Sequence, residues 1–199
     1  MQDPASRVQA FLAAGHVCTV VGYASYAEFC QRFRVPVVVA GFEPLDLLAG
    51  ILACVEQLET GRSEPQNCYG RSVRIEGNPQ AQALVDDVYE PCDRVWRGLG
   101  MMPRGGLRLR AAWQDYDARR RFGVSTSEQP DLDACCAGDV LAGHIKPTQC
   151  PQFGRGCTPE TPIGAPMVSS EGACAAYYRY ARAALQPVTI EFTRAAKTR

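Results

Sequence analysis

Five cysteines in the last third of the chain carry the strongest chemical signal in the sequence. Thiolates are soft ligands for zinc and for iron–sulfur clusters, and they also form redox pairs. Intervals of fourteen, six and sixteen residues separate Cys135, Cys150, Cys157 and Cys174, and Cys136 directly follows the first of them. Cys174 lies in the first turn of an expected helix, where the helix dipole stabilises a thiolate. These thiols are therefore the first candidates for a site.

The spacing leaves three kinds of site open: an iron–sulfur cluster, a zinc site, and a set of buried or redox thiols. Zinc sites commonly use cysteine pairs separated by two residues, and this chain has no such pair. Its only histidines are His16 and His144, so few mixed Cys/His sites are possible. The stretch 147–166 holds too many prolines for regular helix or sheet. Such a loop can wrap a metal centre that supplies its missing core.

The overall composition is that of an ordinary globular protein. The 199 residues are 46% hydrophobic and 21% charged, with a formal net charge of zero. A neutral chain gives no electrostatic reason to expect binding to nucleic acid or to an anionic membrane. The N-terminus lacks the apolar run of a signal peptide, and the best apolar run, 45–55, is too short to cross a bilayer. We therefore expect a cytoplasmic protein whose cysteines are ligands or buried thiols rather than disulfides.

The first hundred residues alternate between strand and helix signals. Apolar and β-branched runs predict strands over 17–22, 36–41 and 71–76. Apolar residues at helical spacing predict helices over 25–33, 43–61 and 77–91. In the longest of these, the recurring residues are Leu47, Leu48, Ile51, Leu52, Val55 and Leu58. This alternation predicts an α/β domain over residues 1–100, with a parallel sheet flanked by helices.

The regular pattern decays after about Pro91. Residues 101–199 are expected to form an extended connection and then an irregular iron–sulfur lobe rich in Cys, Pro and Gly. Short strand-like pieces occur near Leu107, and 125–131 is typical of a linker or exposed loop. A short helix is predicted over 133–143, and a C-terminal helix over 169–185 closes the lobe.

Outside this lobe the candidates are weaker. Glu43 lies where the second predicted strand meets the long helix, so its carboxylate either favours the helix dipole locally or lines a ligand cleft at the sheet edge. His16 is expected to be structural. Trp96 with Gly98 forms either a docking surface or a packed turn. The cysteines expected to be small buried hydrophobes are Cys18, Cys30 and Cys54.

Several stretches together resemble the HypD family of [NiFe]-hydrogenase maturation proteins. They are GHVCTVVG, PVVVAGFEPLDLLAGI, IEGNPQAQ, WRGLG and CPQFGRGCTPETPIGAPMVSSEGACAAYYRY. The resemblance runs in order from about residue 10 to about residue 182. It implies a [4Fe-4S] cluster held by four cysteines. It also implies assembly of an iron carrying cyanide and carbonyl ligands, together with HypC, and with HypE delivering the cyanide.

The resemblance assigns the cluster ligands motif by motif. Cys150 matches the C-P-x-F-G motif, Cys157 matches C-x-P, and Cys174 matches S-S-E-G-x-C. The fourth ligand belongs three residues before the Gly of a G-[ED]-[VI]-L motif, which makes it Cys135. Cys136 is the near alternative, one residue away.

The chain also departs from the family pattern. Some relatives carry an extra thiol pair beside the cluster, and Pro166 and Ala137 stand at those positions here. HypD-like chains are nearly twice as long, and their N-terminal half holds the cysteine that binds the cyanide-bearing iron. We therefore expect this chain to correspond to the C-terminal half of the family pattern, either as a partial gene product or as one half of a split protein with a separate N-terminal half. The alternative is a zinc-stapled or thiol-packed binding module without redox chemistry.

Overall fold

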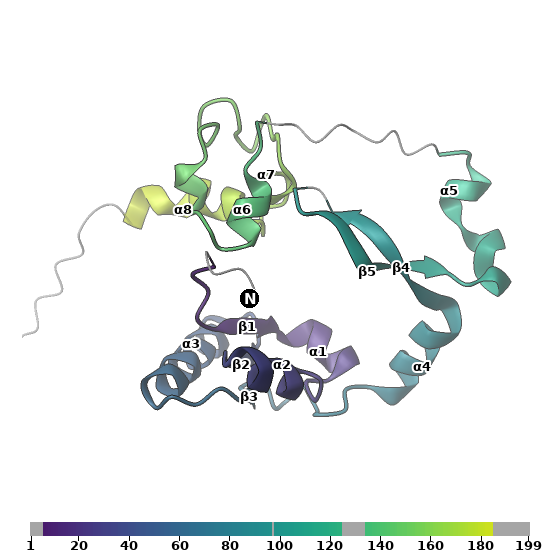
Figure 1. Cartoon of the computed structure of the whole chain (residues 1–199), viewed down its shortest axis with the longest axis horizontal. Coiled ribbons are helices and arrows are strands. Elements are labelled where there is room, and N and C mark those ends of the chain that lie inside the picture. Colours follow the sequence, from purple (N-terminus) through teal and green to yellow (C-terminus); the bar gives the residue numbers. More distant parts are fainter. Residues whose placement is uncertain (1–5, 97, 125–133, 185–199) are drawn as a thin grey trace, which may run out of the picture. The chain divides into compact units, whose positions relative to one another are not determined.

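The computed structural model of the chain describes residues 6–96, 98–124 and 134–184 (Figure 1). It contains two compact units. The first comprises Met1–Val95 with Met101–Glu128, and the second comprises Trp96–Gly100 with Gln129–Arg199. The division into domains at residue 100 stays a prediction, and the linker predicted over 125–131 lies outside the described residues.

A parallel three-stranded sheet forms the centre of the first unit. Its strands are β1 (Phe11–Ala14), β2 (Val37–Ala40) and β3 (Pro65–Asn67), in that order across the sheet. Phe11 lies opposite Val37 in the first pair of strands, and Val37 lies opposite Pro65 in the second. The α/β class with a parallel sheet is therefore confirmed.

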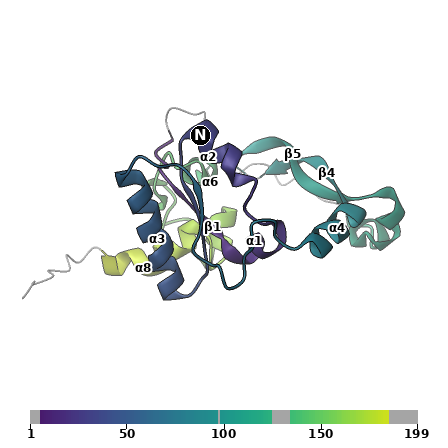
Figure 2. The ribbon, with the colours of Figure 1, turned by 90° about the horizontal axis from the view of Figure 1, so that it is seen from below.

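Helices cover both faces of this sheet. They are α1 (Gly15–Val21), α2 (Tyr26–Phe33) and α3 (Pro44–Glu59). Successive side chains of a strand point to opposite faces. Val38 of β2 packs with Ala53 and Cys54 of α3, and Val39 packs with Cys18 of α1. All four residues of β2 are buried because both faces are covered. Figure 2 shows α3 on one side of the strands and α1 on the other.

Two of the three predicted strands are wrong. Residues 17–22 belong mostly to α1, and the first strand is the preceding segment Phe11–Ala14. Residues 71–76 form turns, and the third strand is β3. The Val and Thr residues of 17–22 favour a strand by propensity, but packing Cys18 against the sheet from a helix overrides that preference.

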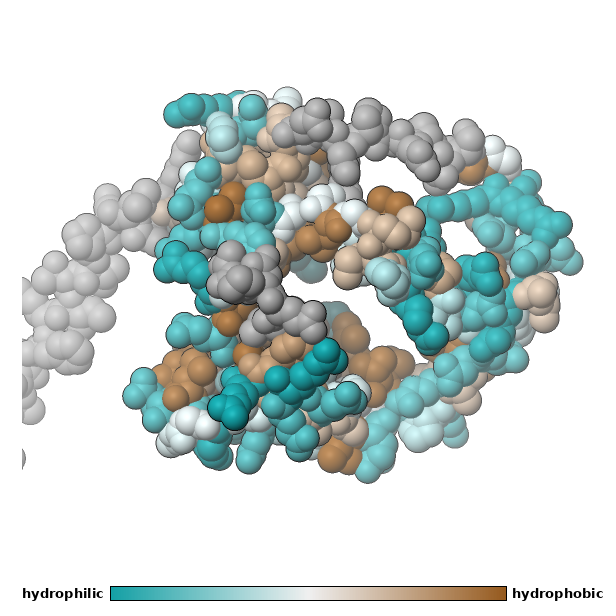
Figure 3. Space-filling model, in the orientation of Figure 1, coloured by the Kyte–Doolittle hydropathy of each residue, from teal (hydrophilic) through white to brown (hydrophobic). Residues whose placement is uncertain are grey.

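Helix α3 buries its small residues and exposes its large aliphatic ones. Gly50, Ala53 and Cys54 face the sheet, whereas Leu48 is 62% exposed. Small side chains let the helix approach the sheet closely, so the apolar spacing predicted the helix correctly without identifying its buried face. The exposed aliphatic residues are Leu45, Leu47, Leu48, Ile51, Leu52, Val55 and Leu58. They form part of the brown surface at the position of α3 in Figure 3.

One helix and a separate pair of strands follow the sheet. Helix α4 (Pro79–Val88) begins after Asn78, whose side-chain oxygen accepts hydrogen bonds from the backbone N–H groups of Gln80 and Ala81 at 3.1 Å. Two long strands then pair with each other, and sequence reasoning missed the first of them. The remaining elements are β4 (Tyr89–Trp96), β5 (Gly100–Leu109), the 3₁₀-helix η1 (Ala111–Tyr116) and α5 (Ala118–Arg121).

Short helices and irregular loops make up the second unit. Its elements are α6 (Ala137–Leu141), the 3₁₀-helix η2 (Pro147–Gln149), α7 (Ala165–Val168) and α8 (Ala173–Ala184). A small core of Cys157, Met167 and Ala175 holds them together, and Met167 is only 1% exposed. Among the described residues of the chain, no helix is both long and apolar enough to span a membrane.

The burial of β2 predicts how the first unit responds to truncation. Val38→Ala should lower the free energy of unfolding by about 2 kcal/mol, because two buried methyl groups are lost and a cavity remains. Val55→Ala is the matched control, since Val55 is 48% exposed, and should change it by no more than about 0.5 kcal/mol. Urea unfolding followed by circular dichroism measures both. Equal losses would contradict the observed packing.

Candidate metal centre

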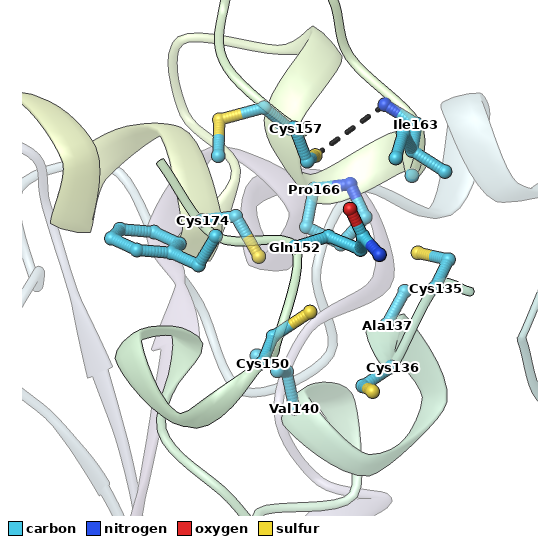
Figure 4. A pocket seen from close by; sticks show the side chains of 13 residues that line it. Cys135, Cys136, Ala137, Val140, Cys150, Gln152, Cys157, Ile163, Pro166 and Cys174 are labelled. Atoms are coloured by element: carbon cyan, nitrogen blue, oxygen red, sulfur yellow. Dashed lines mark hydrogen bonds between the residues drawn. The ribbon is translucent and has the colours of Figure 1, made fainter. Parts of the chain in front are cut away.

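All five cysteines of the last third line one small cavity in the second unit (Figure 4). Its volume is about 20 Å³, roughly the space for one water molecule. In Figure 4 the sulfur atoms of Cys135, Cys150 and Cys174 point toward the middle of this space. The cysteines of the cavity are Cys135, Cys136, Cys150, Cys157 and Cys174. Residues separated by up to thirty-nine positions in the chain therefore meet at one place.

Different elements bring these thiols together. Cys136 immediately precedes α6, Cys150 follows η2, and Cys174 is the second residue of α8. The loop that carries Cys157 folds back on itself. The backbone N–H of Cys157 donates to the carbonyl of Gln152 at 2.9 Å, and its own carbonyl accepts from Gly154 at 3.0 Å. These bonds satisfy backbone groups that a loop without regular structure leaves open.

The pKa of Cys174 indicates that the other predicted ligands lie close to it. Burial raises the pKa of the Cys174 thiol to about 11, and the neighbouring thiols of Cys157, Cys135 and Cys150 add to the rise. These three are the other predicted ligands. Negative charges in one cavity repel each other, so the Cys174 thiol stays protonated until a cation compensates the charge.

Hydrogen bonds distinguish the remaining thiols. Burial raises the pKa of Cys150, but hydrogen bonds from the backbone N–H groups of Gln152 and Cys136, the Cys136 thiol and the backbone of Phe153 outweigh it, so the pKa lies below its usual value. Burial and the hydrogen bond to Cys150 raise the pKa of Cys136. The sulfur of Cys157 accepts from the backbone N–H of Ile163 at 3.4 Å, a contact that sequence reasoning could not have found.

The cavity offers mainly sulfur donors, and thiolates can bind either a single zinc ion or an iron–sulfur cluster. Among the described residues, no three His, Cys, Asp or Glu side chains gather in the way that one metal ion requires. A zinc ion needs all its sulfur ligands at about 2.3 Å from one point. A [4Fe-4S] cluster binds each thiolate through a different iron, so its ligands surround a larger space. Sulfur and apolar groups line most of the cavity, and in Figure 4 the amide of Gln152 is seen between the sulfurs of Cys174 and Cys135.

The two positions at which some relatives are expected to carry an extra pair of thiols also line the cavity. Ala137 and Pro166 are both buried there, and neither side chain can take part in thiol chemistry. The only thiols around this cavity are thus the four predicted ligands and Cys136.

Glu43 lies at the carboxyl edge of the sheet, where it forms an ion pair. Arg71 contacts Glu43 at 2.9 Å and reaches both oxygens of Asp46 at 2.8 and 2.5 Å. Hydrogen bonds from Arg71, and then from Glu43, hold the pKa of Asp46 below its usual value. Sequence reasoning missed Arg71, because twenty-five residues separate it from Asp46 and no local pattern links them. His16, exposed in α1, has its ring 4.8 Å from that of Phe42.

The cysteines of the first unit do not form a comparable group. Cys18, Cys30 and Cys54 are buried, which confirms the prediction that they act as small hydrophobic residues. Cys68 is half-buried, and its pKa is raised by burial and by Glu56. All ten cysteines of the chain lie within the described residues, and all are free thiols.

Comparison with known proteins identifies the family. The family model for HypD, described as the hydrogenase formation hypA family, matches residues 1–181. The chain belongs to the HypD family. It is 46% identical to the hydrogenase maturation factor HypD of Rhodobacter capsulatus over 191 residues, covering 92% of this chain and 51% of that protein.

Other HypD proteins give the same picture. The chain is 48% identical to HypD of Rhizobium leguminosarum bv. viciae over 177 residues, which are 88% of this chain and 46% of that protein. It is 44% identical to HypD of Escherichia coli K12 over 183 residues, which are 90% of this chain and 48% of that protein. The chain thus spans about half the length of these HypD relatives.

The pKa of Cys150 is lowered and that of Cys174 is raised, so the two thiols should react at different rates with an alkylating reagent in the metal-free, reduced protein. At pH 8 roughly one Cys174 in a thousand is a thiolate, because its pKa is about 11, whereas Cys150 has a lowered pKa and a larger thiolate fraction. Iodoacetamide should therefore modify Cys150 first, although both residues are partly exposed. The rate at Cys174 should keep rising up to about pH 11. Mass spectrometry of the peptides measures both rates. Equal rates at pH 8 in the folded protein would contradict the geometry, and unfolding in urea should abolish the difference.

Proposed function

We propose that this chain is the cluster-bearing part of a HypD-type [NiFe]-hydrogenase maturation factor. Cys135, Cys150, Cys157 and Cys174 hold one [4Fe-4S] cluster in the second unit. The chain takes part, with HypC-like and HypE-like proteins, in assembling the iron that carries two cyanides and one carbonyl. That iron is the cargo, and the [4Fe-4S] cluster is the resident cofactor.

One observation carries this proposal: the thiol of Cys174 is perturbed by three other cysteines, and these are the remaining three predicted ligands. Family membership supports it independently, since the relatives are named hydrogenase maturation factors. When bound, a [4Fe-4S] cluster gives or takes one electron and cross-links the segments that ligate it.

Three kinds of group in this chain would contribute to binding such a cluster: the four thiols, backbone N–H groups and the side chain of Gln152. The four thiols lose their protons and provide the ligands, so binding depends on pH and releases protons. The backbone N–H groups of Ile163 and Gln152 donate to the sulfurs of Cys157 and Cys150, which stabilises the thiolates. The side chain of Gln152 has to move outward, because the cavity as it stands has a volume of only about 20 Å³.

Substitution of single cysteines tests the ligand set. Cys150→Ser or Cys157→Ser should strongly lower bound iron and sulfide and destabilise the second unit, because metal binding and folding are coupled there. Cys136→Ser should keep its cluster and is the matched control, since it lines the same cavity. The measurement is iron, sulfide and zinc analysis after anaerobic purification.

The outcomes separate the proposal from its rivals. A brown protein with iron and sulfide in equal amounts supports the cluster. A colourless wild-type protein with one zinc, or with no metal, would refute the proposed cluster. Full cluster content in Cys150→Ser would also do so, and loss of iron in Cys136→Ser but not in Cys135→Ser would mean that the fourth ligand is misassigned.

We propose in addition that this chain alone does not hold the cyanide-bearing iron. The chain spans about half of its relatives, and the cavity thiols serve the cluster. Outside the cavity, Cys68 has a raised pKa and its thiol donates to the carbonyl of Ala49, so it is a poor thiolate donor.

Infrared spectroscopy tests this second point. The chain co-purified with a HypC protein should show no cyanide or carbonyl stretching bands. Adding the N-terminal half of the Rhodobacter capsulatus HypD should restore HypC binding. Bands from the chain and HypC alone would show that one of its own thiols holds the iron.

A further inference from the structure

Two adjacent thiols compete for one position in the cavity. Cys135 and Cys136 both line it, and a shift of one residue in the chain would exchange them. The sequence offers no chemical difference between them, so the selection has to come from their surroundings. In the structure these surroundings are three glycines from three separate segments, Gly98, Gly138 and Gly164.

Gly164 makes the space for the sulfur of Cys135. A Cβ atom on residue 164 would collide with this sulfur and would lie 3.5 Å from the Cβ of Ala137. The sulfur therefore occupies the volume that any other residue at 164 would fill. Cys135 could escape such a collision only by rotating its side chain or by moving its backbone, and either change takes the sulfur away from its present place.

Gly98 and Gly138 fix the same segment from its other end. A Cβ atom on Gly138 would collide with the carbonyl oxygen of Gly98, and one on Gly98 would lie 2.9 Å from the backbone nitrogen of Gly138. Gly98 also has a φ of +82°, which favours glycine. Gly98 thus lies against the start of α6, and the backbone N–H of Leu99 donates a hydrogen bond to the Trp96 carbonyl at 2.9 Å.

We propose that Gly98, Gly138 and Gly164 form a glycine clamp that selects Cys135, rather than Cys136, as the fourth thiol of the site. This inference rests on the proposed function for the identity of the bound group. The clamp itself is a set of close contacts within the chain and acts in the metal-free protein. The three glycines are positioning residues, since they act through Cys135.

Cys136 is the natural substitute if the clamp is opened. Its thiol hydrogen-bonds to that of Cys150, so it already contacts one ligand of the site. A small rotation of the segment before α6 would bring its sulfur inward as that of Cys135 leaves. The clamp therefore controls which thiol binds, and opening it does not have to abolish binding.

A ligand exchange tests the clamp. In the wild-type chain, Cys135→Ser should lose iron and Cys136→Ser should keep it. In the Gly164→Ala background this order should reverse, with the greater loss of iron in Cys136→Ser. Gly70→Ala is the control background, because a Cβ atom there meets nothing within 4 Å and its backbone is not left-handed, and it should leave the order unchanged. An unchanged order in Gly164→Ala overturns the clamp.

A second measurement uses the metal-free protein and is independent of the cluster. Iodoacetamide modification, located by tandem mass spectrometry, gives the ratio of rates at Cys135 and Cys136. This ratio should rise several-fold in Gly164→Ala and in Gly138→Ala, but not in Gly70→Ala. An unchanged ratio overturns the clamp even if iron binding changes. If the wild-type chain binds no iron, the proposed function fails while this ratio still tests the clamp.

A double-mutant cycle covers the case in which Gly164→Ala does not fold. Removing the sulfur in Cys135→Ala takes away the atom that a Cβ on residue 164 would meet. The double variant should therefore recover folded structure by circular dichroism, and the coupling between the two changes should be large. Failure to recover would mean that residue 164 acts through other contacts, and the clamp would be wrong.

Discussion

Several thiols have to reach one cavity from segments that have little regular structure, and the second unit is arranged around this requirement. Its prolines prevent a sheet or a long helix over 147–166. The segments instead meet through short helices, turn hydrogen bonds and a core of three buried residues, Cys157, Met167 and Ala175. One of the three core residues is itself a predicted ligand. Packing and the proposed metal binding therefore draw on the same atoms.

This overlap gives the two units different sources of stability. The first unit has a conventional core, in which β2 is buried between α1 and α3 by valine, alanine and cysteine side chains. In the second unit, thiolates in the shared cavity would repel one another without a cation, which is one cause of the raised pKa of Cys174. In the proposed function, the free energy of metal binding contributes to the folding of the second unit.

Close backbone approach is a theme of both units, with different consequences. In α3, small residues on one face bring the helix against the sheet and leave the large aliphatic side chains outside. In the second unit, glycines let the segments at Gly98 and Gly164 approach the first turn of α6 and Cys135 before it. In both places small residues determine which parts of the chain touch, and a pattern of large hydrophobic residues does not reveal them. Periodicity therefore predicts the helices well and their contacts poorly.

The sequence determined the α/β class, the helices over 26–33 and 44–59, the buried strand at Val37–Ala40 and the identity of the thiols, because each depends on local composition or spacing. It misplaced the outer strands, since Pro65–Asn67 has no strand propensity and 17–22 has it without being a strand. Only the tertiary structure decided which face of α3 is buried, that Arg71 pairs with Glu43 and Asp46, and that Cys135 faces Gly164. These contacts join residues that are far apart in the chain or equal in chemistry, so three-dimensional packing alone distinguishes them.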